Sequence, residues 1–173
     1  MFVRPLLPAE APLYVALRHE MLADAPWAFG ASPQDDTRLD PDRVARNIRH
    51  GETNGGYTLI GAFVEANSTL TLVGTAELMR DSTLKTRHRA DIYSVYVTPP
   101  YRAQGAASKI IAEAKRIART WPGINSLRLS VSVRSPGAQR VYEHAGFVAW
   151  GREPACLHVN GEFIDEIHMV CFL

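Results

Sequence analysis

The junction at residues 102–108, Arg-Ala-Gln-Gly-Ala-Ala-Ser, carries residue types that suit a phosphate group. Strand-forming residues precede it, and a helical pattern begins at Ala106. The first amides of a helix lack partners within it and lie at its positive dipole end, so they bind phosphates. Gly105 permits a left-handed turn or a close approach to a ligand, and Arg102 adds a cation. The alternative is that these small residues only let the helix pack on a sheet.

Several motifs of known phosphate-binding and catalytic sites do not occur in the sequence, and this limits the reactions that the junction could serve. The sequence contains neither the G-x-x-x-x-G-K-[ST] nor the G-x-G-x-x-G phosphate motif, and no G-x-S-x-G nucleophile motif. No group of His, Cys, Asp and Glu has the spacing of metal ligands. The two cysteines, Cys156 and Cys171, match no zinc or redox pattern and are interpreted as free thiols of a reducing compartment.

Composition predicts one globular domain over residues 1–173. Hydrophobic residues make up 46% of the chain, enough for a sizeable core, and the formal net charge is +1. That balance does not favour binding to nucleic acid or to a membrane surface. The N-terminus lacks the pattern of a signal peptide, and no apolar run is as long as a membrane span. We therefore expect a cytoplasmic protein.

The periodicity of the sequence predicts the elements that position the junction. Strands are expected at 2–7, 57–66, 70–80, 90–97, 126–133, 147–153 and 162–173, and helices at 8–23, 41–50, 106–121 and 135–147. Asp40 and Ser135 are expected to cap two of these helices. Three consecutive strands before the long helix argue against a doubly wound sheet. The order predicts an α/β fold with a mixed sheet and helices on both faces.

Two segments resemble motifs of the GCN5-related N-acetyltransferase (GNAT) superfamily. The segment "RAQGAA" is similar to the family signature [Q/R]-x-x-G-x-[G/A], and it lies between a predicted strand and a predicted helix, as the family requires. About thirty residues later, "AQRVYEHAGF" is similar to the family segment A-x-x-[L/V]-Y-x-x-x-G-F. The specified positions are filled by Arg102, Gly105 and Ala107 in the first motif and by Ala138, Val141, Tyr142, Gly146 and Phe147 in the second.

This resemblance implies a sheet of about seven mainly antiparallel strands whose fourth and fifth strands splay apart around acetyl-CoA. The backbone of the fourth strand, at Val95, Tyr96 and Val97, would pair with the pantetheine arm. Ser135 is a weaker candidate for a cofactor contact, because many relatives have Asn there. Backbone amides would hold the pyrophosphate at Arg102, Ala103, Gln104, Gly105, Ala106, Ala107 and Ser108. Many relatives have Gly in place of Ala103.

The resemblance also suggests catalytic roles. Tyr142 matches the tyrosine that protonates the leaving thiolate, and a phenol pKa near 10 keeps it protonated at neutral pH. Asp91, at the start of the fourth strand, aligns with a carboxylate that serves as base in some relatives, with Tyr93 on the same face. Glu77 is the second candidate for the base. Three weaker candidates are Glu166, His158 and His168.

The sequence therefore predicts an N-acetyltransferase that moves an acetyl group directly from acetyl-CoA to a primary amine of a small molecule or peptide. Trp27 and Phe29 either line the acceptor pocket or pack their loop, and Asp35 and Asp36 could attract an ammonium group. A homodimer is possible. The alternatives are a non-catalytic CoA-binding sensor or assembly module of the same fold, and a related fold that does not bind CoA.

Overall fold

One seven-stranded sheet, in the order β1-β2-β3-β4-β5-β7-β6, organises the computed structural model, which describes residues 1–37 and 39–173. All neighbouring strands are antiparallel except β4 and β5, which are parallel. The strands are β1 (Phe2–Pro5), β2 (Tyr57–Ala66), β3 (Thr69–Arg80), β4 (Arg89–Val97), β5 (Ser126–Ser132), β6 (Val148–Val159) and β7 (Glu162–Phe172).

The pairing between β4 and β5 is short, and this positions the site. It runs from Arg89 opposite Ser126 to Asp91 opposite Arg128 and then ends, although both strands continue. The two strands therefore diverge beyond Asp91, as the resemblance implied.

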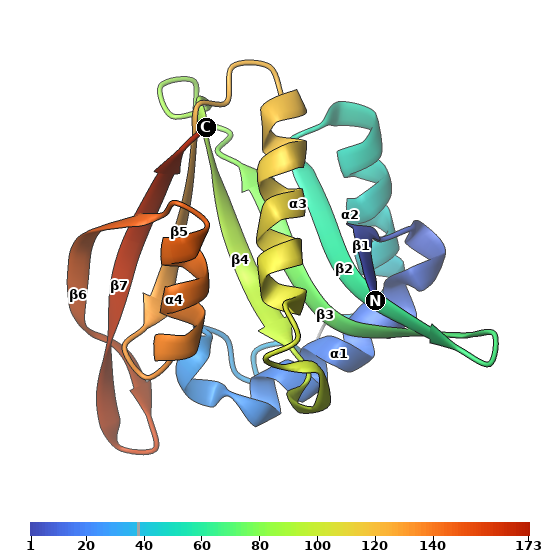
Figure 1. Ribbon diagram of the computed structural model, residues 1–173, viewed down its shortest axis with the longest axis horizontal. Coiled ribbons are helices and arrows are strands. Elements are labelled where there is room, and N and C mark those ends of the chain that lie inside the picture. The colour runs from blue at the N-terminus through green and yellow to red at the C-terminus, as the bar shows by residue number, and fades with distance from the viewer. Residues whose placement is uncertain (38) are drawn as a thin grey trace.

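Helices cover both faces of the sheet (Figure 1). α3 (Ala106–Thr120) and α4 (Pro136–His144) lie in front of it in that view, and α1 (Ala11–Asp24) and α2 (Pro41–Asn54) lie behind it. The chain also contains three short 3₁₀ turns, η1 (Pro8–Glu10), η2 (Pro26–Ala28) and η3 (Pro99–Tyr101). Each face of the sheet has its own buried apolar cluster, one under α3 and α4 and the other under α1 and α2. The sheet is thus the middle layer of three.

The sequence of α3 explains how this helix fixes the position of the junction at residues 102–108. Its apolar residues recur at helical spacing and are buried against the sheet, including Ile110, Ile111 and Ile117. Each buried isoleucine contributes about 1.5–3 kcal/mol of hydrophobic stabilisation. The helix begins directly after Gly105 and ends before Pro122. Its first turn is therefore held in place by the core beneath its later turns.

The predicted order of strands and helices is confirmed, and several boundaries are corrected. β1 ends at Pro5 rather than residue 7, and η1 separates it from α1. α2 continues to Asn54, because the left-handed residue that ends it is Gly55 (φ 67°). β6 extends to Val159 through an irregular stretch of its pairing with β7. Asp40 caps α2 as predicted, since its carboxylate accepts a hydrogen bond from the Arg43 amide at 2.7 Å.

No helix in the described ranges has both the length and the apolar character needed to cross a membrane. The same residues also contain no group of three or more His, Cys, Asp or Glu side chains that could hold a metal ion.

Candidate active site

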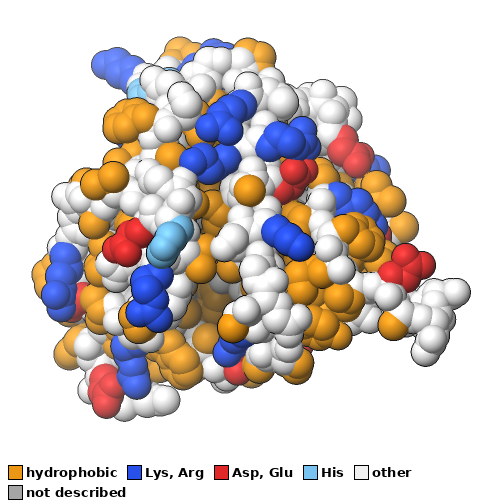
Figure 2. Space-filling model, viewed as in Figure 1, with side chains coloured by type: hydrophobic (Ala, Val, Ile, Leu, Met, Phe, Trp, Pro, Cys, Tyr) orange, Lys and Arg blue, Asp and Glu red, His pale blue; other side chains and the backbone are white. Residues whose placement is uncertain are grey.

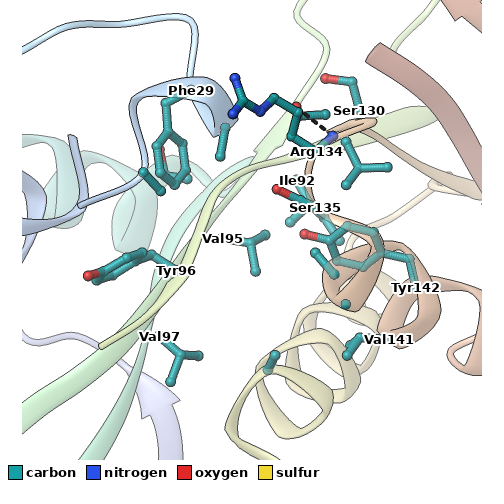
Figure 3. Close-up of a pocket in the computed structure, with 18 of the residues that line it drawn as sticks. Phe29, Ile92, Val95, Tyr96, Val97, Ser130, Arg134, Ser135, Val141 and Tyr142 are labelled. Carbon is teal, nitrogen blue, oxygen red and sulfur yellow. Dashed lines mark hydrogen bonds between the residues drawn. The ribbon is translucent and has the colours of Figure 1, made fainter. Parts of the chain in front are cut away.

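A cavity of about 1260 Å³ opens where β4 and β5 diverge. One side is formed by β4 from Ile92 to Val97, and the other by β5 and α4, including Ser130 and Tyr142. Figure 3 shows Val95 and Tyr142 pointing into this space from opposite sides. The cavity continues from the first turn of α3 to the loop around η2 and to β7. The cavity therefore connects the first turn of α3, where a phosphate could bind, with the region between η2 and β7, where a second ligand could bind.

Two left-handed residues shape the phosphate end of the cavity. Gly105 precedes α3 with φ 79°, and Ala103 also has a positive φ, of 58°. Glycine adopts a positive φ readily, whereas an alanine at position 103 bears a conformational cost of about 1–2 kcal/mol. Five other residues of the predicted cradle line the cavity with Ala103, namely Arg102, Gly105, Ala106, Ala107 and Ser108. Gln104 does not, and its side chain instead donates to the Pro100 carbonyl at 2.9 Å.

Arg102 fastens this loop to the end of β4. Its Nε donates to the Val97 carbonyl at 2.9 Å, its Nη2 pairs with Asp24, and its guanidinium lies 5.5 Å from the Tyr96 ring centroid. Arg102 thus positions the phosphate loop as well as adding charge. A further cation comes from α4, where Arg140 lines the cavity together with the imidazole of His144. Figure 2 shows this face hollowed between α4 and the start of α3, with basic side chains beside the hollow.

Tyr142 lies across the cavity from β4. Its side chain is 5% exposed, and burial raises the pKa of its phenol, which therefore stays protonated at neutral pH. The ring packs against Phe147, while the hydroxyl points into the cavity and bonds to no described residue. A local hydrogen bond, which would have indicated a purely structural role, is thus not formed within the described chain. The hydroxyl is free to donate to a ligand.

Comparison with known proteins gives the same result as the geometry. Residues 14–147 match the model of the Acetyltransferase (GNAT) family. The chain belongs to this family. A search of curated proteins by sequence found no match.

Solved structures confirm the GNAT fold over the whole chain. A GNAT-family acetyltransferase from Streptococcus pneumoniae is 21% identical with a TM-score of 0.87, and 99% of each chain is covered. A ribosomal-protein-alanine N-acetyltransferase from Brucella melitensis is 19% identical with a TM-score of 0.80, and all of each chain is covered. A phosphinothricin acetyltransferase from Sinorhizobium meliloti, solved with acetyl-CoA, is 17% identical with a TM-score of 0.79, covering 99% of this chain and 87% of that one.

The residues of this GNAT chain are suited to acetyl-CoA. The amides at the start of α3 line the cavity together with the guanidinium groups of Arg102 and Arg140, and phosphate groups accept hydrogen bonds from donors of both kinds. The diverging strand β4 presents its edge along the middle of the cavity, at Val95, Tyr96 and Val97. The Tyr96 side chain points the other way, and its hydroxyl donates to Glu20 and Asp24. Acetyl-CoA as the cofactor agrees with the family.

Ser135 lies at the cavity but does not act as expected on the helix. It occupies the N-cap position of α4, yet its side chain makes no capping hydrogen bond. The prediction that its hydroxyl caps α4 is therefore wrong. Because Ser135 also lines the cavity, that hydroxyl lies beside the space for the cofactor.

The two carboxylates ranked first as bases lie outside the cavity lining. Asp91 is the last β4 residue paired with β5, and its carboxylate accepts from Arg128 at 2.7 Å. Glu77 lies behind Ser94, from which it accepts a hydrogen bond at 3.0 Å, and it lines a smaller cavity of about 200 Å³. Both are held by other side chains of the protein. This geometry does not favour either as the group that touches the amine.

Glu166 on β7 is instead the only carboxylate among the described residues that line the main cavity. It lies opposite Ser132 of β5, and the Cys156 thiol donates to it over 3.5 Å. The two histidines considered as weaker candidates are elsewhere. His168 bonds to Glu153 at 2.9 Å and His158 stacks on Phe163, and neither lines the cavity. The sequence ranked Glu166 below Asp91 and Glu77, because the proximity of β7 to β5 arises only in the folded sheet.

The loop around η2 closes the other end of the cavity. Trp27 and Phe29 both line it, and both also pack, Trp27 under Arg134 at 5.6 Å and Phe29 against the edge of Tyr96. The predicted acidic pair has other partners in the chain: Asp35 accepts from Ser32 and Asp36 from Arg18. Arg18, Ser94 and Arg134 line the cavity without any local signal in the sequence that marks them.

Proposed function

We propose that the chain acts as one N-acetyltransferase domain that transfers an acetyl group directly from acetyl-CoA to a primary amine in a ternary complex. The observation that carries this proposal is the continuous cavity, which joins the amides at the start of α3 to Tyr142 and then to Glu166. The neighbours named above act on a ribosomal-protein alanine and on phosphinothricin. The acceptor is therefore left as a primary amine of a small molecule or peptide.

Glu166 supplies the proton acceptor in this proposal. An alkyl ammonium has a pKa of about 10.4, so at neutral pH the amine must lose a proton before it can attack. The acyl donor, when bound, supplies a thioester that an amine can attack. Glu166 lines the cavity beside Cys156 of β6, whose thiol donates to its carboxylate. It is placed to take the proton directly or through one water.

Tyr142 is the proton donor in this proposal. Its phenol faces Val95 across the cavity and remains protonated because burial raises its pKa. We assign it the donation of a proton to the departing thiolate. Because Tyr142 is on α4 and Glu166 is on β7, separate residues supply the acid and the base.

Cys156 is not assigned a covalent role. Its thiol lies at the cavity, but burial and the Glu166 carboxylate raise its pKa to about 12. Only the thiolate is a good nucleophile, and at neutral pH this thiol is almost entirely protonated. An acetyl-cysteine intermediate is therefore disfavoured, and this supports direct transfer.

The proposal is tested by thiol release from acetyl-CoA against a panel of amines, amino acids, polyamines and peptides. We expect acetyl-CoA to raise the melting temperature and at least one amine to stimulate thiol release. A thermal shift with no release across the panel would favour the non-catalytic CoA-binding module. No shift with either acetyl-CoA or CoA would reject both readings.

Replacing Tyr142 by phenylalanine tests the acid. We expect Tyr142→Phe to lower kcat about 10-fold to 100-fold, at or below the low end for general acids, because a thiol pKa of about 8.5 makes the thiolate a tolerable leaving group. Affinity for acetyl-CoA should change little, since the buried ring remains. Tyr57→Phe, at a half-buried tyrosine of β2 that lines the smaller cavity but not the main one, is the matched control. Unchanged turnover in Tyr142→Phe would remove the assigned role.

A further inference from the structure

A bulge interrupts β4 at the point where the strand passes the centre of the cavity. Pairing with β3 is regular up to Tyr93 opposite Glu77 and resumes at Tyr96 opposite Thr75. Ser94 and Val95 therefore share the space opposite one residue of β3. Ser94 has φ 54°, a left-handed conformation that serine seldom adopts. Such a conformation persists only where the surroundings determine it, and bulges of this kind occur beside active sites.

Side chains from two other elements, α1 and β3, hold Ser94 in this conformation. Its hydroxyl accepts from Arg18 Nη1 of α1 at 2.8 Å and donates to Glu77 Oε1 of β3 at 3.0 Å. The same Glu77 oxygen accepts from the Tyr14 hydroxyl of α1 at 2.5 Å. Tyr14 is buried, and the side chain of Arg18 is only 13% exposed. Hydrogen bonds to charged groups in such surroundings are strong and resist exchange with water.

The network continues from Arg18 to the acceptor end of the cavity. Arg18 Nε donates to Asp36 Oδ2 at 2.6 Å, and the Asp36 side chain is 20% exposed. Asp36 belongs to the loop that follows η2, which we call the acceptor-side loop (residues 29–37), and this loop contributes Phe29 to the cavity beside Trp27 of η2. Arg18 itself lines both the main cavity and the smaller one. One guanidinium thus connects the acceptor-side loop with the bulge.

We propose that Arg18 and Ser94 are positioning residues that tie the acceptor-side loop to the β4 bulge and so aim the bulge's backbone donors at the acetyl carbonyl. The inference rests on the proposed function, because it assumes that acetyl-CoA lies along β4. It assigns Glu77 a part in this network in place of a direct role as base. Donors that are aligned before the reaction stabilise the developing oxyanion without reorganisation. A small misplacement of such donors is costly.

The infrared carbonyl stretch of bound acetyl-CoA, labelled with heavy carbon at the carbonyl, tests the alignment without an acceptor amine. In the wild type we expect the stretch to lie below that of free acetyl-CoA, because the carbonyl accepts hydrogen bonds. Ser94→Gly should move it back towards the free value while acetyl-CoA affinity is retained. Glycine adopts φ 54° readily, so this variant removes the hydroxyl without adding strain. If the hydroxyl only offsets local strain, Ser94→Gly would leave the stretch unchanged.

Two further variants test the connection to the loop. Arg18→Met should shift the stretch as Ser94→Gly does, and Asp36→Asn should shift it partly. The double variant Arg18→Met/Asp36→Asn should have the same carbonyl stretch as Arg18→Met alone, because Asp36 acts through Arg18. Arg116→Met breaks an exposed ion pair with Glu113 on α3, outside the cavity, and is the matched control that should leave the stretch unchanged.

The outcomes separate this inference from the proposed function. Acetyl-CoA that binds with a stretch unaffected by Ser94→Gly and Arg18→Met would overturn the positioning role and leave the proposed function intact. A wild-type protein that does not bind acetyl-CoA would overturn the proposed function, and the inference with it. Where an accepting amine is found, the same variants should lower kcat about 10-fold to 100-fold.

Discussion

Glu166→Gln should lower the rate of amine acetylation near pH 7 about 100-fold or more, within the range for loss of a general base. The amide keeps the volume and the polarity of the side chain but cannot accept the proton. The deficit should shrink as the pH approaches about 10, because the free amine then loses its proton in solution. The measurement is kcat/KM against pH for the wild type and the variant, with an amine identified by the panel.

Glu153→Gln is the matched control for this experiment. Glu153 lies opposite Glu166 in the pairing of β6 with β7 and accepts a hydrogen bond from His168, but it does not line the cavity. The Glu153→Gln variant should retain wild-type activity. A Glu166→Gln enzyme as active as the wild type at pH 7 would contradict the assignment. Slow turnover in Asp91→Asn at a normal acetyl-CoA affinity would then return the role to Asp91, and slow turnover in Glu77→Gln would return it to Glu77 only if the carbonyl stretch of bound acetyl-CoA were unchanged.

The features that the sequence predicted well depend on residues close together in the chain. The apolar spacing of Ile110, Ile111 and Ile117 and the small residues before them predict α3 and its exposed first amides. Tyr142 could be placed because its motif lies within one short helix and the loop after it. Local patterns of this kind survive folding, because neighbouring residues in a helix or turn have fixed relative positions.

The positions of the candidate carboxylates and of the bulge depend on pairing between distant strands. Counting along β4 puts Asp91 near the site, but the register with β5 sets it beside Arg128, before the strands diverge. Glu166 reaches the cavity only because β7 inserts between β5 and β6. The bulge at Ser94 has no glycine to mark it, since side chains from α1 and β3 hold its conformation. Sheet order and register are long-range properties that local patterns do not encode.

Gly105→Asp should weaken acetyl-CoA binding about 100-fold or more, by the repulsion of two charges a few ångströms apart near a protein surface. Asp tolerates a left-handed conformation better than most residues, so the fold should be retained at φ 79°. Gly105→Asn has nearly the same shape without the charge and should lose much less affinity. Titration calorimetry with acetyl-CoA at low and high salt measures the difference, which should narrow as salt screens the repulsion.

Gly161→Asp provides the control for backbone strain. Gly161 has a similar φ of 83° in the β6–β7 turn, outside the cavity, and, as at Gly105, a Cβ there would meet no atom within 4 Å. The variant should bind acetyl-CoA as the wild type does.

The open space around Gly105 also bears on the alternative that this residue serves only packing. A residue that serves only packing should have close neighbours. Gly105 has none within 4 Å of an added Cβ, whereas the next residue, Ala106, is buried. Equal affinity for acetyl-CoA in Gly105→Asp and the wild type would contradict the prediction that this junction binds a phosphate group.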